Sequence, residues 1–133
     1  MATSTLLTTA ERERRPTAID ETHLSRMTLG DRQLEREVLE IFVRQTAIML
    51  DRIMSAERAL AAAAAHTLLG SARGIGAWRV ARAAERLELA AGEAGSLTDM
   101  DEAIAELKAA SLEACAAIAE RLTALLAELA RAR

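Results

Sequence analysis

The stretch AHTLLGSARGIGA, residues 65–77, contains the turn that organises the fold. Gly74 and Gly76 lie on either side of an isoleucine, a pattern suited to ending one helix and turning sharply into the next. The residues before the turn are rich in alanine and leucine, which favour helix. We therefore expect one helix to end at about Ala72 and the next to cover about residues 77–91.

Apolar residues recur at helical spacing on both sides of this turn, as in helices that bury one face. The positions expected to face the core are Leu34, Val38, Ile41, Phe42, Ile48, Met49 and Ile53 in a helix over about 32–54, Leu60, Ala64 and Leu68 before the turn, Val80, Ala84 and Leu87 after it, and Ile104, Leu107, Ser111, Ala114, Ile118, Leu122, Leu125 and Leu129 in a last helix. Asp20 is expected to cap a short first helix, and Thr98 or Asp99 to cap the last one.

The composition predicts the same fold class. Hydrophobic residues make up 51% of the 133 residues, aromatic residues only 2%, and Pro16 is the only proline. Short connections make successive helices antiparallel, so we expect an all-α fold: an up-and-down antiparallel four-helix bundle with a short extra N-terminal helix. Residues 1–17 include the charge run ERERR and are expected to form a flexible N-terminal arm, and residues 18–133 the bundle domain.

Charge and cysteine content exclude several classes of function. The net charge of −3 gives no reason to expect a nucleic acid as partner. The single Cys115 cannot form an internal disulfide, and no apolar run approaches the roughly 18 residues of a membrane span. We expect a cytoplasmic protein without membrane contact. The two histidines, His23 and His66, are 43 positions apart without a second ligand at helical spacing, so no metal is expected. No glycine-rich phosphate loop follows a strand, so no bound nucleotide is expected either.

His66 is flanked by small residues. Ala62 precedes it by four positions and Gly70 follows it by four, so both are its neighbours on one helix face. A glycine inside a helix costs roughly 1 kcal/mol relative to alanine, which indicates that the position has a use. We infer that these small residues give another protein access to the imidazole, as a phosphorylatable histidine requires. His23 is interpreted as a structural residue.

His66 is also the first position of a longer pattern. It is followed by Leu68, Gly70, Ser71 and Gly76, and further on by Leu87 and Glu88. From about residue 20 to residue 130, the chain resembles the histidine-containing phosphotransfer (HPt) domains of two-component phosphorelays. The resemblance implies that His66 accepts a phosphoryl group from an aspartyl phosphate on a receiver domain and passes it to another receiver, without kinase or ATPase activity.

The same resemblance implies the partners. These are the receiver domains of response regulators and a hybrid histidine kinase, with Mg²⁺ bound by the receiver and no cofactor bound by this chain, which is expected to be a monomer. An unperturbed imidazole has a pKa of about 6.5, so a neutral ring nitrogen is available near neutral pH without a dedicated base.

One position departs from the family pattern. Many members have a lysine three residues after the histidine, where this chain has Leu69. Two other interpretations therefore stay open. The first is a pseudo-HPt scaffold or inhibitor that binds a receiver or kinase without carrying phosphate. The second is a dimerisation bundle, in which the small residues serve packing between subunits.

Arginines near His66 are candidates to replace the missing cation. The residues assigned to the partner-facing surface are Ala62, Leu69, Gly70, Arg73, Arg79, Arg82 and Arg86, with Ser71 and Gly76 in support. The alternative for the arginines is a solvated face paired with Glu85 and Glu88, which contributes little energy. Trp78 is expected to pack at a helix start, and Ser71 to bond back to a carbonyl one turn earlier.

Overall fold

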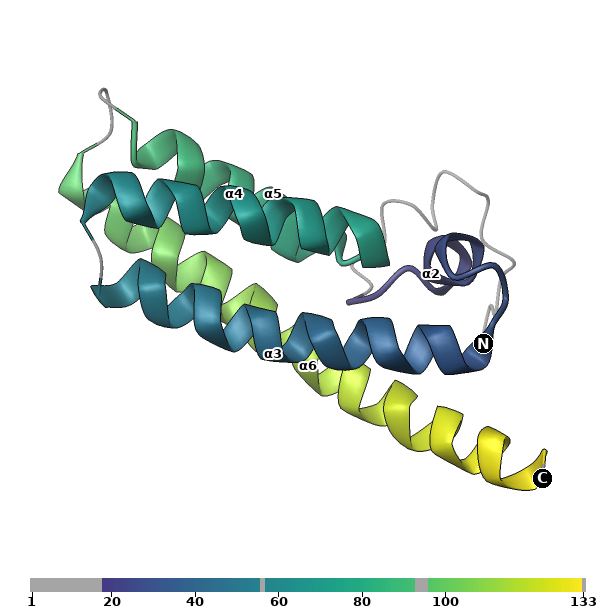
Figure 1. Ribbon diagram of the computed structural model, residues 1–133. Coiled ribbons are helices and arrows are strands. Elements are labelled where there is room, and N and C mark those ends of the chain that lie inside the picture. Colours follow the sequence, from purple (N-terminus) through teal and green to yellow (C-terminus); the bar gives the residue numbers. More distant parts are fainter. Residues whose placement is uncertain (1–17, 56, 93–95, 133) are drawn as a thin grey trace, which may run out of the picture.

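The computed structural model describes residues 18–55, 57–92 and 96–132, which form five helices and no strand (Figure 1). The helices are α2 (Glu21–Met27), α3 (Arg32–Ser55), α4 (Arg58–Ile75), α5 (Trp78–Ala90) and α6 (Leu97–Arg131). Helices α3 to α6 run alternately up and down, and α2 lies at one end of them (Figure 1). The predicted all-α bundle with a short extra helix is confirmed. The arm predicted for residues 1–17 lies outside the described residues, and the domain limits stay a prediction.

The core lies between the inner faces of α3 to α6. Its largest fully buried apolar side chains are Leu39 and Phe42 from α3, Leu68 from α4, Val80 and Leu87 from α5, and Leu107, Ile118 and Leu125 from α6, together with Leu24 from α2. Burying each such side chain contributes roughly 1.5–3 kcal/mol. The buried alanines of α4 and α5, such as Ala72 and Ala84, have small side chains that let these two helices approach closely.

The face that α3 buries differs in part from the predicted one. Phe42, Met49 and Ile53 are buried as predicted, but Leu34, Ile41 and Ile48 are 37%, 51% and 50% exposed. Glu35, Leu39 and Thr46 are buried instead. Apolar residues line two adjacent stripes of this helix, and the contacts with α4 and α6 select one of them. The prediction that Leu60 faces inward is also wrong, because α4 buries Ala61, Ala64 and Leu68, and Leu60 lies outside that face.

Two helix boundaries also differ from the prediction. Helix α4 continues to Ile75, three residues beyond the expected end, and Gly76 caps it in the left-handed conformation. Helix α6 begins after Ser96, whose side chain accepts a hydrogen bond from the backbone N–H of Asp99. The Asp99 carboxylate in turn accepts one from the backbone N–H of Ser96. The expected cap at Thr98 or Asp99 is therefore wrong, since Asp99 is the partner of the cap.

Helix α2 is attached to the turn between α4 and α5. The Asp20 backbone N–H donates to the Gly76 carbonyl at 2.9 Å, and the Asp20 carboxylate accepts from Trp78 Nε1 at 3.0 Å. His23 Nε2 donates to the Arg73 carbonyl at 2.9 Å, and its ring lies 4.8 Å from that of Trp78. Burial alone would raise the pKa of Asp20, but the hydrogen bonds from Trp78 and the His23 backbone outweigh it and lower that pKa. His23 and Trp78 thus have the structural roles expected of them.

Replacing Gly76 by alanine is expected to destabilise the protein by about 1–3 kcal/mol. The Gly76 φ angle is +80°, and an added Cβ would lie 2.9 Å from Asp20 Cβ, too close for either atom to stay in place. Chemical denaturation would measure the loss. Gly74→Ala is the matched control, because its Cβ would meet nothing within 4 Å and alanine favours helix. Equal stability of the two variants would contradict this account of the turn.

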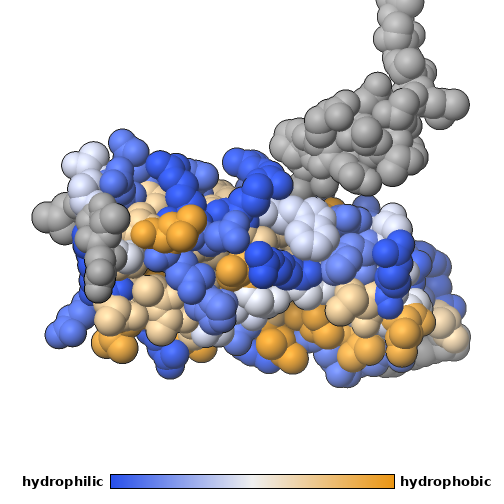
Figure 2. All heavy atoms as spheres, turned by 90° about the horizontal axis from the view of Figure 1, so that it is seen from above, coloured by the Kyte–Doolittle hydropathy of each residue, from blue (hydrophilic) through white to orange (hydrophobic). Residues whose placement is uncertain are grey.

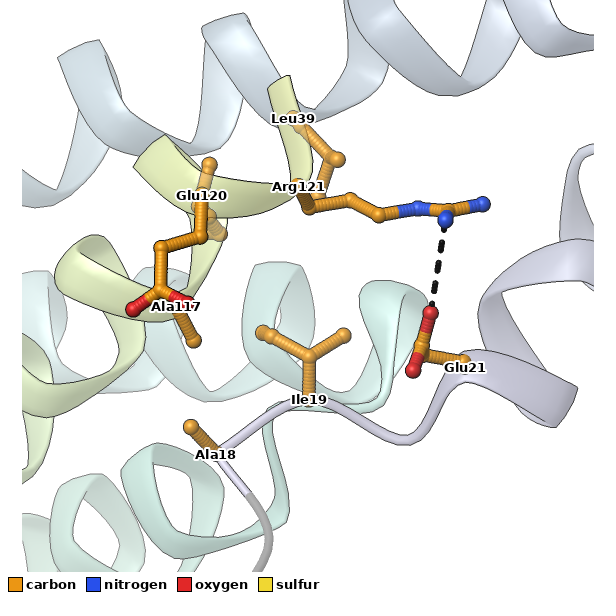
Figure 3. A pocket seen from close by; sticks show the side chains of 8 residues that line it. Ala18, Ile19, Glu21, Leu39, Ala117, Glu120 and Arg121 are labelled. Carbon is orange, nitrogen blue, oxygen red and sulfur yellow. Dashed lines mark ion pairs between the residues drawn. The ribbon is translucent and has the colours of Figure 1, made fainter. Parts of the chain in front are cut away.

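A pocket of about 440 Å³ lies at the α2 end of the bundle, between residues 18–21, α3 and α6 (Figure 3). The Arg121 guanidinium lies at its edge and points toward the Glu21 carboxylate, at 3.5 Å. Arg121 Nε also donates to Glu35 at 2.6 Å, and the Glu35 side chain is 1% exposed. The hydrogen bond to Glu35 raises the pKa of Arg121 despite the opposing effect of burial. None of the residues lining this pocket comes from α4 or α5.

Candidate functional site

His66 lies on the outer face of α4, and its side chain is 71% exposed. One turn further on, Gly70 is also exposed, and a Cβ added there would meet nothing within 4 Å. One turn earlier, Ala62 is half-buried. Figure 2 shows the face of the bundle that lies at the top of Figure 1, over α4 and α5. Much of this face is hydrophilic, and hydrophobic side chains gather along its lower edge in that view. The imidazole is therefore open to an approaching molecule.

The contact that defines this site is made by Glu88 of α5. Its carboxylate oxygens lie 3.0 Å and 3.3 Å from His66 Nδ1. A carboxylate only accepts hydrogen bonds, so Nδ1 carries a proton and the lone pair of the neutral ring lies on Nε2. Within the described part of the chain, Nε2 has no hydrogen-bond partner. The site thus presents one unprotonated nitrogen outward and holds the other in place.

The sequence interpretation gave Glu88 no such role. It appeared there as a match to the family pattern and as a partner for arginines. A usable signal was nevertheless present, since His66 stands eleven residues before Ala77, in the turn, and Glu88 eleven after it. In two antiparallel helices joined by a tight turn, residues at equal distances from the turn lie side by side. The turn therefore places Glu88 level with His66 along the bundle.

The three arginines of α5 do not form one stripe beside His66. Arg79 pairs with Glu113 of α6 at 2.5 Å, and Arg86 pairs with Glu102 and Glu106 of the same helix. The expectation that Arg79 and Arg86 border the same surface as His66 is wrong, because both point to the opposite flank of α5. Their acidic partners also differ from the Glu85 and Glu88 of the alternative interpretation.

Two other arginines do lie on the His66 side of α5. Arg73 of α4 is 3.6 Å from Glu85, and Arg82 is exposed without an ion pair to any described residue. They line a shallow pocket of about 170 Å³ between α4 and α5, whose residues are Leu69, Arg73, Trp78, Ala81, Arg82 and Glu85. Positive charge therefore lies about two helical turns from the imidazole along α4.

Leu69 and Ser71 lie differently from the predictions. Leu69 is only 6% exposed, so its expected place on the accessible surface is wrong. It belongs to the face of α4 that packs inward and forms the buried part of the shallow pocket. Ser71 donates to Gln45 Oε1 of α3 at 2.5 Å rather than to a carbonyl of its own helix. Its hydroxyl thus links two helices of the bundle.

The described part of the chain shows neither a metal-binding cluster nor a membrane-spanning helix. No group of three or more His, Cys, Asp or Glu side chains is arranged there to hold a metal ion. None of the helices described has the length and apolarity needed to cross a membrane.

Fold and site together describe a helical bundle that offers one exposed imidazole to another molecule, the arrangement of a histidine carrier. The family model of the Hpt domain matches residues 37–132, and the chain belongs to this family. Hpt domains are phosphoryl carriers of phosphorelays and interact with receiver domains. Comparison with curated proteins and with solved structures gives no match.

Proposed function

We propose that His66 accepts a phosphoryl group from the aspartyl phosphate of one receiver domain and passes it to another receiver. The observation that carries this proposal is the state of the imidazole: Glu88 holds Nδ1, and Nε2 is open on an exposed ring. The lone pair on Nε2 is the nucleophile. It is positioned before the partner arrives, which is the main contribution that a protein makes to phosphoryl transfer.

The receiver supplies the rest of the chemistry. Its acidic pocket and Mg²⁺ neutralise the phosphoryl group during transfer, so this chain needs no cofactor and has no kinase or ATPase activity of its own. Arg82, which forms no ion pair with a described residue, adds positive charge on the His66 side of the bundle, whereas Arg73 is paired with Glu85. Complementary charge of this kind orients an acidic partner and speeds its association more than it tightens binding.

The proposal is tested by incubating the protein with a phosphorylated receiver domain and Mg²⁺. We expect label on this chain that is labile in acid and stable in base, as phosphohistidine is. Binding to the receiver without label would support the pseudo-HPt scaffold instead, an alternative motivated by the buried Leu69 at the family's lysine position. An obligate dimer in which His66 is protected would support the dimerisation bundle.

Replacing Gly70 by leucine is expected to slow phosphoryl transfer by about tenfold or more while leaving the fold intact. The added side chain projects into open space, so the bundle does not resist it, but it stands one turn from the imidazole and obstructs a docking receiver. Transfer rates and thermal unfolding would be measured together. Gly70→Ala is the matched control and is expected to transfer nearly as fast as the natural protein. Equal rates for the leucine variant would contradict the access argument.

A further inference from the structure

The shallow pocket between α4 and α5 combines an apolar floor with one positive charge in excess. Its volume of about 170 Å³ is close to that of a cavity which holds benzene, roughly 150 Å³. Leu69 and Ala81, both buried, form the floor. Two arginines and one glutamate line the rim, where the Arg73 guanidinium lies 3.6 Å from the Glu85 carboxylate. The charge of Arg82 is therefore left without an acidic partner among the described residues.

We propose that this α4–α5 pocket selects the receiver domain by taking up one of its glutamate side chains, with the methylene groups against Leu69 and the carboxylate on Arg82. This inference rests on the proposed function and adds the feature that distinguishes one receiver from another. A glutamate matches both parts of the pocket, because its stem is apolar and its head carries the opposite charge. An arginine and a carboxylate can form two parallel hydrogen bonds, which adds geometric selectivity to the attraction.

The α4–α5 pocket lies within the area that any partner of His66 must cover. Leu69 follows His66 by three residues and Arg73 by seven, which corresponds to about 4.5 Å and about 10.5 Å along α4. A standard protein interface covers about 800 Å² on each partner, the area of a disc with a radius of roughly 16 Å. A receiver that brings its aspartate to Nε2 of His66 therefore also covers the pocket.

The walls of the α4–α5 pocket are fixed before a partner arrives. Trp78, which lines it, donates from Nε1 to the Asp20 carboxylate at 3.0 Å, and this bond holds the indole ring in place. Leu69 packs in the core, and the ion pair between Arg73 and Glu85 joins the two helices at the rim. A pocket formed in advance loses little conformational entropy when it is filled, so its shape and charge can discriminate between partners.

The pocket also gives a use to the residue that departs from the family pattern. Leu69 stands where many Hpt domains have a lysine, and its side chain lines the pocket. A lysine at this position is longer and would occupy part of the same space with a second positive charge. Leucine keeps the space open for a side chain of the partner and leaves Arg82 as its unpaired cation.

The test compares two phosphoryl donors of different size. One is the phosphorylated receiver domain that labels the natural protein fastest among a panel of receiver domains, and the other is phosphoramidate, a small molecule that does not dock. At low ionic strength, Arg82→Ala is expected to take label from the receiver about tenfold more slowly, through a higher KM for the receiver and an unchanged kcat. The difference is expected to shrink as salt is added. Labelling by phosphoramidate is expected to be unchanged.

Two further variants separate the charge at this position from general effects. Arg82→Lys keeps the charge without the planar guanidinium and is expected to regain most of the rate. Arg79→Ala removes an arginine from the opposite flank of α5, where it pairs with Glu113, and is expected to leave labelling by both donors unchanged. Arg82 is exposed and alanine favours helix, so thermal unfolding of Arg82→Ala is expected to match that of the natural protein.

A double-mutant cycle identifies the side chain that enters the pocket. Each glutamate on the receiver surface around the phosphorylated aspartate is replaced in turn by glutamine, which keeps the stem and removes the charge. One of these receivers is expected to label the natural protein more slowly but to label Arg82→Ala as fast as the unmodified receiver does, so that the two effects are not additive. Additive effects for every glutamate would overturn the proposed occupant.

The outcomes distinguish this inference from the proposed function. If the receiver labels Arg82→Ala as fast as the natural protein, the role of the α4–α5 pocket is wrong and the carrier function stands. The role of the pocket is likewise overturned, and the carrier function kept, if phosphoramidate labelling slows as much as labelling by the receiver, because Arg82 then does not act through docking. If no phosphorylated receiver labels the natural protein, the carrier function itself is overturned, and the role of the pocket with it.

Discussion

His66→Gln is expected to reduce phosphoryl acceptance to the background of an unlabelled protein. Glutamine is polar and similar in length, but its amide nitrogen has no lone pair available for attack, because that pair is delocalised into the carbonyl. The His66 side chain is 71% exposed and makes no core contact, so stability is expected to change by no more than about 0.5 kcal/mol. Loss of label thus reports chemistry and not unfolding.

The other histidine provides the matched control. The His23 ring packs against Trp78, and its Nε2 donates a hydrogen bond to the Arg73 carbonyl. We expect His23→Gln to lose about 1 kcal/mol of stability with this hydrogen bond and to take up label normally. Acid-labile label and denaturation curves on both variants would complete the measurement. Label that persists in His66→Gln, or disappears in His23→Gln, would reject His66 as the acceptor.

The parts of the fold that the sequence predicts are those set by short-range chemistry. Asp20 caps α2 because its carboxylate reaches a backbone N–H three residues ahead, and Gly76 ends α4 because the left-handed conformation there suits glycine. His66 and Gly70 share a helix face for the same local reason. Such features depend on a few neighbouring residues, so the order of residues is enough to find them.

The parts that the sequence does not predict depend on partners far along the chain. Glu35 enters the core because Arg121 meets it there, 86 positions away, and nothing in the residues around Glu35 indicates that partner. Arg79 and Arg86 turn away from His66 because acidic residues of α6 lie on their other side. Glu88 is an intermediate case, since the position of the turn fixes its height along the bundle but not the direction of its side chain.

Arg121→Leu is expected to destabilise the protein by about 3 kcal/mol. Glu35 is 1% exposed, and Arg121 Nε is its closest partner at 2.6 Å. Removing the guanidinium leaves a buried carboxylate with only Arg32, at 3.1 Å on a side chain that is 45% exposed. Arg79→Leu is the matched control, because it breaks a largely exposed pair with Glu113 and is expected to lose no more than about 1 kcal/mol.

Pairing Arg121→Leu with Glu35→Leu is expected to restore most of the lost stability. The large loss in the single variant comes from the uncompensated charge of Glu35, and a buried ion pair often contributes little net stability relative to apolar residues of similar volume. Chemical denaturation of the single variants and the double variant gives the coupling free energy between the two positions. A double variant as unstable as the sum of the single ones would show that packing, and not charge, holds this end of the bundle together.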